Sequence, residues 1–470
     1  QYAKCHMDDV IVPFQATIDY SGFRVLAVAK LPITKTEFNE SGDIKRTRTE
    51  HVLGTIDRGM TVQNQSKLLD TIMARYAKQI NLARHFVKGE NDLNAREVYS
   101  SVDIRGFKGK DKFYLLNFWR GLPSENPKFT PHLSQSTRGN SIFWRMLRPE
   151  FVKAYKVPLS ADANCQVTNE ASDWIEQLDE NERATTYLVE TVIPRFAEEL
   201  RERDLNGNVM NAYGIDLTAD MHREGINMRH LGLIRKKFWR KLSGTGSLNF
   251  HTKKLMTSID CTKQVERGDQ LKFCNIMFKI SLDSKDAFTP FEIPLDRLFN
   301  QDSINHQPMY AGEVKDDRNS DKIRDIILAE MIARTLKNIM RQYMRHAAIK
   351  MKVSVKNIQI TLITEFLNII TGSHDNSDMF WQEQLYLGIV HRFGQCAIAS
   401  SERKTFKLQM QHMIVYMVKR FTDMNGISLS NDCIAYMYDS PIMFRFVGLD
   451  VEKPGPRVKH NISQVDFADA

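Results

Sequence analysis

The first part of the chain alternates short apolar runs with turn residues, a pattern that predicts β-strands. Two runs, Thr17–Tyr20 and Phe23–Leu31, lie on either side of a Ser-Gly pair and predict a hairpin. A second hairpin is expected around a turn at Phe107–Lys112. Between the two hairpins, apolar residues recur at helical spacing, so Ser66–Gln79 is expected to be a helix.

Beyond Pro127 the spacing of apolar residues changes to that of helices. Pro194 should kink the helix expected at Glu182–Arg203, because proline removes a helical hydrogen bond. Ser160–Asn181 is polar and is expected to be a linker, and Gln301–Ser320 is expected to be a mobile loop. The expected helices are Ile142–Tyr155, Glu182–Arg203, Asp321–Lys350, Val355–Ile370, Trp381–Val390 and Lys404–Met424. The pattern predicts an α+β fold, with an antiparallel β-rich N-terminal part packed with helices and then a mainly helical domain.

Length and composition are those of an ordinary globular protein. A chain of 470 residues is expected to form two or three domains. No run approaches the ~20 apolar residues that a membrane-spanning helix needs. The six cysteines form no CxxC pair, which is typical of reduced thiols in a cytosol-like compartment and argues against zinc. Because the chain begins at Gln1, the natural N-terminus is expected to lie upstream, where a targeting peptide would also lie.

Positive charge is concentrated in one segment. Arg223–Lys254 contains nine lysines and arginines against one acid, Glu224, so its excess of eight equals the formal net charge of the chain, +8. A local basic strip is typical of a polyanion partner. The residues expected to contact RNA are Arg229, Arg235, Lys236, Lys237, Trp239, Arg240 and Lys241. The cations would contact phosphates while Phe238 and Trp239 stack on bases. In the alternative interpretation the two aromatic residues are core anchors and the lysines form a solvated face.

The expected long helix carries a second, lower-ranked candidate. Its apolar stripe, which should face the core, consists of Ile332, Leu336, Ile339, Tyr343 and Ala347. The basic residues expected on the opposite face are Arg334, Lys337, Arg341 and Arg345. Such a face is also typical of simple solvent exposure, or of a contact with an acidic protein. Salt-dependent binding would separate these interpretations, because each neutralised phosphate steepens the salt dependence.

No catalytic constellation emerges from the sequence. The glycine-rich run Gly244–Ser247 lacks the spacing of a phosphate-binding loop. His222 and His230 have no carboxylate at metal-ligand spacing, so core or surface histidines are expected. The strand FYLLNFWRG has Asn117 where a kinase would need an aspartate to bind magnesium. We therefore expect that the protein is not an enzyme and has no metal and no cofactor.

Several segments, taken in order, resemble the clustered-mitochondria (Clu) family. They include TIDYSGFRVLAVAKLP, HVLGTIDRGMTV, VYSSVDIRGFKGKDKFYLLNFWRGLPSEN, MLRPEFVKAY, GINMRHLG, EMIARTLKNIM, FLNIITG and VKHNIS. The second hairpin places Asn117 where the family usually has aspartate, and keeps Gly109, Asp111, Arg120 and Pro123. Any one of these motifs is weak, but their order runs over nearly the whole chain.

The resemblance implies a domain organisation. We expect a Clu domain at residues 8–350 and a mainly helical, Clu-central-like domain at residues 351–470. The family passes quickly from GINMRHLG to the next helix, whereas here residues 236–320 intervene as an insertion that holds much of the basic strip. Family members usually continue into tetratricopeptide repeats. Residues 1–470 contain none, so either the repeats lie outside this sequence or the chain is a shortened relative.

What the resemblance implies about function is a cytoplasmic, non-enzymatic protein. The family binds messenger RNAs that encode mitochondrial proteins, associates with translation and influences mitochondrial distribution. The expected partner is therefore RNA, together with protein partners from the translation machinery or a large assembly, and with no membrane insertion. The alternative is a scaffold subunit that docks in a larger protein assembly through its basic insertion and has no RNA role.

Overall fold

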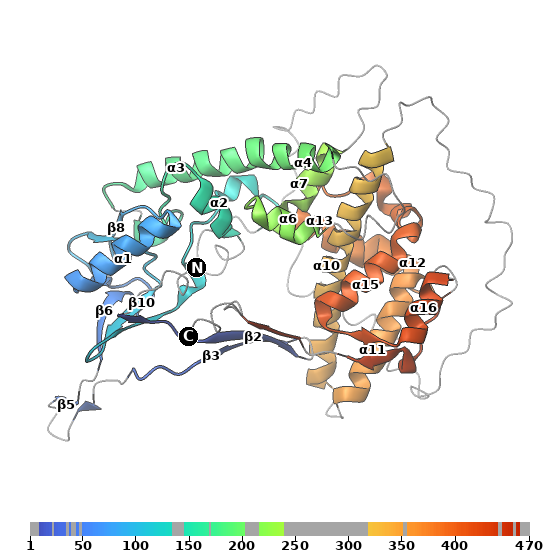
Figure 1. The fold of residues 1–470 in the computed structure, drawn as a ribbon, viewed down its shortest axis with the longest axis horizontal. Helices are drawn as coiled ribbons and strands as arrows, with labels where there is room; N and C mark the ends of the chain where they lie inside the picture. The colour runs from blue at the N-terminus through green and yellow to red at the C-terminus, as the bar shows by residue number, and fades with distance from the viewer. Residues whose placement is uncertain are drawn as a thin grey trace, which may run out of the picture.

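The computed structural model describes residues 9–20, 23–33, 37–38, 44–46, 49–133, 145–168, 171–202, 216–238, 318–350, 355–439, 444–454 and 457–460. A strand-rich end carries the N-terminal part of the chain and a helical end carries the C-terminal part (Figure 1). The predicted α+β class is therefore confirmed.

The N-terminal sheet has the strand order β1–β11–β10–β6–β7. Its strands are β1 (Val10–Ile11), β6 (Glu50–Gly54), β7 (Gln63–Asn64), β10 (Arg105–Lys108) and β11 (Phe113–Leu116). β1 pairs with β11 in parallel, and the other neighbours are antiparallel. The predicted helix is confirmed as α1 (Lys67–Ile80), whose N-cap Ser66 accepts a hydrogen bond from the amide of Leu69. Leu69 and the other buried residues of α1 share one core with Val52 and Leu115 of the sheet.

The first predicted hairpin is also confirmed, as β2 (Gln15–Tyr20) and β3 (Phe23–Val28). The strand on the other side of β2 is β14 (Arg457–His460), which comes from the far end of the described chain. This ribbon runs beneath the molecule from the sheet toward the helical end (Figure 1). The remaining strands form short pairs: β4 (Glu37–Phe38) with β5 (Ile44–Arg46), β8 (His85–Val87) with β9 (Arg96–Val98), and β12 (Ser428–Leu429) with β13 (Val451–Lys453).

The prediction of a linker at Ser160–Asn181 is wrong for the second half of this stretch, because α3 (Trp174–Tyr187) begins there. The side chains that α3 buries are polar or small, namely Gln177, Asn181, Ala184 and Thr185, so the helix has no apolar period to recognise. It continues through a π-helical turn, η6 (Leu188–Val192), into α4 (Ile193–Glu202). The wider turn accommodates Pro194 at the second position of α4. Together these elements form the long rod at the top of Figure 1.

The helix expected at Ile142–Tyr155 is shorter than predicted. It begins only at α2 (Pro149–Ala154), because a residue before proline is disfavoured in helical conformation. The helix expected at Lys404–Met424 is divided into α14 (Phe406–Gln409), η12 (Gln411–Met413) and α15 (Ile414–Asn425). Gly426, in a left-handed backbone conformation, ends α15. The other short elements are η2 (Phe118–Arg120), η3 (Pro127–Phe129), η5 (Gln166–Thr168), α12 (Ser377–Met379), η11 (Ser400–Lys404), α16 (Asn431–Asp439) and η13 (Gly448–Asp450).

The helical end is built around the longest helix, α10 (Arg318–Lys350), which includes the last residues of the expected loop at Gln301–Ser320. It packs against α7 (Leu231–Lys237), α11 (Val355–Thr371), α13 (Tyr386–Phe393) and α15. Residues 326–333 of α10 are all at most 2% exposed, so this part of the helix is enclosed on every side. The hydrophobic core is continuous across position 350, the domain boundary expected from the sequence.

Candidate nucleic-acid interface

The segment predicted to bind RNA starts at a tight turn between α6 (Leu217–Arg223) and η7 (Met228–His230). Gly225 occupies this turn with a positive φ of 73°. A Cβ at this position would lie 2.5 Å from the backbone nitrogen of Phe151, so only glycine permits the approach to α2. The glycine that opens GINMRHLG is therefore required by packing.

Arg229, the first predicted RNA contact, is held by a buried carboxylate. Its guanidinium donates to Oε1 of Glu125 at 2.8 and 3.1 Å, and Nε2 of His230 lies 2.9 Å from the same oxygen. Glu125 is 0% exposed. Burial alone would raise the pKa of Glu125, but the charges of Arg229 and His230 outweigh it and lower the pKa to about 2. The guanidinium of Arg229 therefore has a structural role, as the partner of the buried Glu125.

Arg235 is likewise used inside the protein. It is 1% exposed, donates to the carbonyl of Ala397 at 2.7 Å and pairs with Glu402 at 3.1 Å. Three residues earlier, a Cβ at Gly232 would lie 2.3 Å from the carbonyl oxygen of Phe393, so α7 lies directly on the end of α13. The burial of Arg235 argues against its predicted role as an RNA contact.

The two lysines that follow are placed differently. Lys236 and Lys237 are exposed at the C-terminal end of α7. Phe238 is 3% exposed, and the guanidinium of Arg201 lies 5.3 Å from its ring centroid. Phe238 is therefore a core anchor, as the alternative interpretation had it, and not a platform for a base. The predicted contacts Trp239, Arg240 and Lys241 lie outside the described residues, as do residues 239–317 of the insertion expected at 236–320.

The basic residues of α10 do not form a single solvent-facing stripe. Arg334 pairs with Glu330 at 2.7 Å, and Lys337 donates to the carbonyl of Met424 at 2.7 Å. Arg341 and Arg345 are half-buried. The prediction that Arg334 and Lys337 lie on a face of the helix opposite the core is wrong. α10 lies in the centre of a bundle, so its charged side chains must find partners on neighbouring elements. For these two residues the predicted RNA contact has no support from the geometry.

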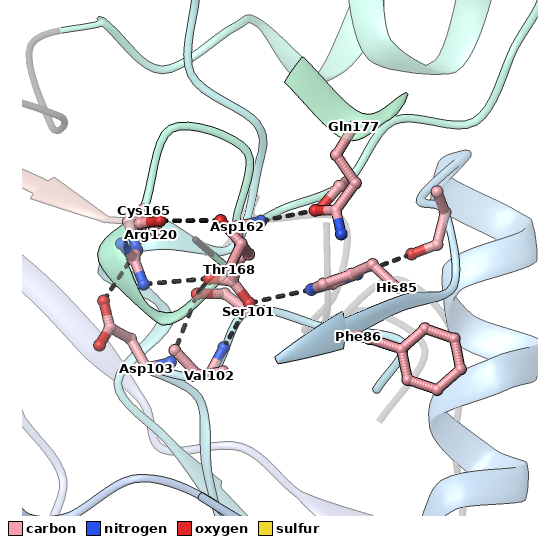
Figure 2. Close-up of polar contacts among 12 residues, drawn as sticks. His85, Phe86, Ser101, Val102, Asp103, Arg120, Asp162, Cys165, Thr168 and Gln177 are labelled. Atoms are coloured by element: carbon pink, nitrogen blue, oxygen red, sulfur yellow. Dashed lines mark hydrogen bonds and ion pairs between the residues drawn. The ribbon is translucent and has the colours of Figure 1, made fainter. Parts of the chain in front are cut away.

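A further buried polar centre, which the sequence analysis did not find, lies at the strand-rich end (Figure 2). The carboxylate of Asp162 is 0% exposed and accepts hydrogen bonds of 3.0 Å from Ser101 Oγ, the amide of Val102 and Arg120 Nη2. Nε2 of His85 lies 3.0 Å from Oδ2, the oxygen that also accepts from the amide of Val102. Burial would raise the pKa of Asp162, but the His85 hydrogen bond and the Arg120 charge lower it.

This arrangement satisfies a carboxylate and does not activate a nucleophile. Ser101 donates to Asp162 and not to His85, so the pair that a serine nucleophile needs is missing. Arg120 also contacts Cys165, yet burial raises the pKa of that thiol. Within the described ranges no group of three His, Cys, Asp or Glu side chains could hold a metal ion. No local sequence motif points to this centre, because its members are spread from residue 85 to residue 165.

None of the helices in the described part of the chain is long and apolar enough to cross a membrane. Among protein families, the model described as Clustered mitochondria matches residues 1–127, and the model described as Translation initiation factor eIF3 subunit 135 matches residues 208–429. No solved structure matches the chain.

Curated relatives also match the chain. A Clustered mitochondria protein homolog from Vanderwaltozyma polyspora is 24% identical over 411 residues, which is 79% of this chain and 30% of the relative. One from Danio rerio is 32% identical over 33% of this chain and 11% of the relative. Protein clueless from Drosophila virilis is 27% identical over 39% of this chain and 12% of its own length. The chain thus spans less than a third of the length of these relatives.

Proposed function

The chain belongs to the clustered-mitochondria family, and from this premise we propose that it is a cytoplasmic, non-catalytic protein of mitochondrial organisation that binds messenger RNA and acts with the translation machinery. The observation that carries the proposal is a direct contact between the two segments that the family models match. Glu125 belongs to the segment matched by the Clu model, while Arg229 and His230 belong to the segment matched by the translation-factor model. A buried ion pair joins them, so the two segments act as one body.

The RNA contact is assigned to the end of α7 and the residues that follow it. Lys236 and Lys237 are exposed there, and Trp239, Arg240 and Lys241 come next in the sequence. Exposed lysines can neutralise phosphates without giving up an internal partner. The contact set that remains from the basic strip is therefore smaller than the sequence predicted and lies at the start of the insertion expected at 236–320.

The proposal is tested by ultraviolet crosslinking of RNA to the double variant Lys236→Glu/Lys237→Glu. We expect crosslinking to fall and the melting temperature to stay unchanged, because both side chains are exposed. The matched control is Lys153→Glu/Lys156→Glu, in which Lys153 of α2 and Lys156 just after it are also exposed. Losing two phosphate contacts should reduce the slope of log K against log salt by about 1.4 for single-stranded RNA. Crosslinking equal to that of the control would contradict the proposal.

The second candidate is a scaffold without an RNA role. It is favoured by the internal use of basic side chains: Arg229, Arg235, Arg334 and Lys337 all bind carboxylates or carbonyls of the chain itself. Mass spectrometry of proteins that co-purify with the same variants decides between the candidates. Loss of protein partners with unchanged RNA crosslinking would establish the scaffold.

A further inference from the structure

Strand β3 forms an exposed edge of the three-stranded sheet. Among the described strands, the order β14–β2–β3 gives β3 a neighbour on one side only, and in Figure 1 it lies on the outer side of β2. All of its residues are exposed. The large apolar ones are Phe23 at 39%, Val25 at 53%, Leu26 at 38% and Val28 at 46%. Covering apolar side chains of this size with a partner is favourable, because it removes them from water.

Proteins usually protect the edges of their sheets with charges, prolines or bulges, because an open edge pairs with other chains. Residues 25–29 contain no charge, no proline and no glycine. β3 also pairs with β2 in one unbroken register, without a bulge. A short, uncharged, apolar strand is the kind of segment that adds to another strand. The edge formed by β3 is therefore suited to binding a strand.

The hydrogen bonds to β2 show which backbone groups of β3 point outward. The amide of Ala29 donates to the carbonyl of Phe14 at 2.8 Å, so these two opposite residues form a hydrogen-bonded pair. Such pairs alternate along antiparallel strands. Every second residue back from Ala29 thus faces β2 with its amide and carbonyl, whereas those of Leu26 and Val28 point away from β2. These outward groups are in position to hydrogen-bond to an added strand.

We propose that β3 binds β3 of a second copy of this chain, in an antiparallel pair with its two-fold axis at Leu26. A two-fold pair uses the same surface of both copies, so each side chain lies opposite one from the same strand. The outward amide and carbonyl of Leu26 bond to those of Leu26 in the other copy. Because Leu26 is the middle residue of 23–29, the two strands overlap over this whole segment.

In this register the side chains of β3 are complementary to those of the second copy. Two large side chains lie opposite alanines, and no charges of the same sign lie opposite each other. The opposed pairs are Phe23 with Ala29, Val25 with Ala27, Leu26 with Leu26, and Arg24 with Val28. A register centred on Ala27 would place Arg24 opposite Lys30, and like charges in this position destabilise a strand pair. A register centred on Val25 would shorten the overlap.

The length of the paired segment sets the strength of the dimer. Two strands of seven residues pair over about 23 Å. This interface is smaller than that of a permanent dimer, so we expect a dissociation constant on the order of 10 μM. The pairing does not involve Lys236 or Lys237, so it can fail or succeed independently of RNA binding.

The test is sedimentation velocity of the full chain from about 1 to about 100 μM, a range that spans the expected constant. The native protein should pass from monomer to dimer. Leu26→Lys should weaken the dimer by at least about 10-fold, because two ammonium groups then lie opposite each other at the axis. Leu26→Glu should have the same effect, whereas an equal mixture of the two variants should dimerise again through opposite charges. The matched control is Leu93→Lys, at a residue that is 94% exposed and outside the strand.

A second variant does not depend on charge. The Cα atoms of a hydrogen-bonded antiparallel pair are about 5.5 Å apart, which is within the range of a disulfide. Leu26→Cys should therefore form a disulfide-linked dimer under mild oxidation. Leu93→Cys is the control, and it should form no more of this product than the native protein does.

Three results would overturn the proposal. The first is a native chain that stays monomeric at about 100 μM, which would leave the edge to a strand of another protein. The second is a dimer that Leu26→Lys weakens no more than Leu93→Lys does, which would place the interface elsewhere. The third is a mixture of the lysine and glutamate variants that stays monomeric while Leu26→Cys forms no disulfide-linked dimer, which would exclude this register.

Discussion

Replacing Glu125 with glutamine should destabilise the protein strongly. The change removes a fully buried negative charge and leaves Arg229, whose side chain is 13% exposed, and His230, at 2%, facing a neutral amide. Breaking a buried ion pair from one side costs about 3–5 kcal/mol. The pKa of Glu125 gives a similar figure, because a fall from 4.5 to about 2 corresponds to about 3 kcal/mol of stabilisation at neutral pH.

Urea-induced unfolding measures this loss, and amide hydrogen exchange shows where it occurs. Exchange is needed because a chain of this length can unfold in more than one step. We expect the largest loss of protection at α7 and around Glu125, close to the contacts of Glu125 with Arg229 and His230. A double-mutant cycle with Arg229→Gln should give a coupling energy of about 0.5–3 kcal/mol, because the two side chains contact each other directly.

The matched control is Glu176→Gln on α3, an exposed carboxylate that should change the free energy of unfolding by less than about 0.5 kcal/mol. If Glu125→Gln lost no more stability than this control, the ion pair would not hold the two matched segments together. Arg229 would then again be a candidate RNA contact.

Three further predictions concern the buried contacts. Acid should unfold the protein as the pH falls from about 4.5 toward 2. The folded-state pKa of Glu125 is depressed, so the stabilisation that its carboxylate provides is fully present above the unfolded-state pKa and is lost as the pH falls toward the folded-state value. A pH titration followed by circular dichroism should show a shallower loss of folded signal in Glu125→Gln. Gly232→Ala should destabilise by about 1–3 kcal/mol in urea, whereas Gly448→Ala, whose Cβ would lie 3.7 Å from its nearest neighbour, should be nearly neutral. Asp162→Asn should cost about 3–5 kcal/mol, since Arg120 loses a buried partner, while the exposed Asp179→Asn should not measurably change the urea midpoint.

The sequence predicted well those elements whose burial is apolar on one side. α1 follows directly from the period of its apolar residues. The β2–β3 hairpin was predicted by other means, from two β-prone runs on either side of a Ser-Gly turn, and the residues of β3 are exposed. The first half of α3, before the helix expected at Glu182–Arg203, was missed because its buried face includes Gln177 and Asn181, which form hydrogen bonds instead of an apolar stripe. Periodicity of hydrophobic residues cannot identify a helix that packs through amides.

The candidate site shows a different limit. Local charge density marks the basic strip in the sequence, but it could not show which of its cations have internal partners. Arg229 finds Glu125, 104 residues earlier, and Arg235 finds Glu402, 167 residues later. Arg235 and Lys236 are adjacent in sequence, yet one is buried and the other exposed. A helix places neighbours about 100° apart, so a run of like charges is divided between the core and the solvent.

The pairing of β2 with β14 has a consequence for synthesis on the ribosome. Val458 is aligned with Ile18 in this sheet, so the partner of an early strand is made some 440 residues later. At about 5–20 residues per second, β2 waits on the order of 20–90 s with one edge unpaired. Exposed strand edges are sites of aggregation, so nascent chains of this protein should depend on chaperones that shield the hairpin until β14 has been made.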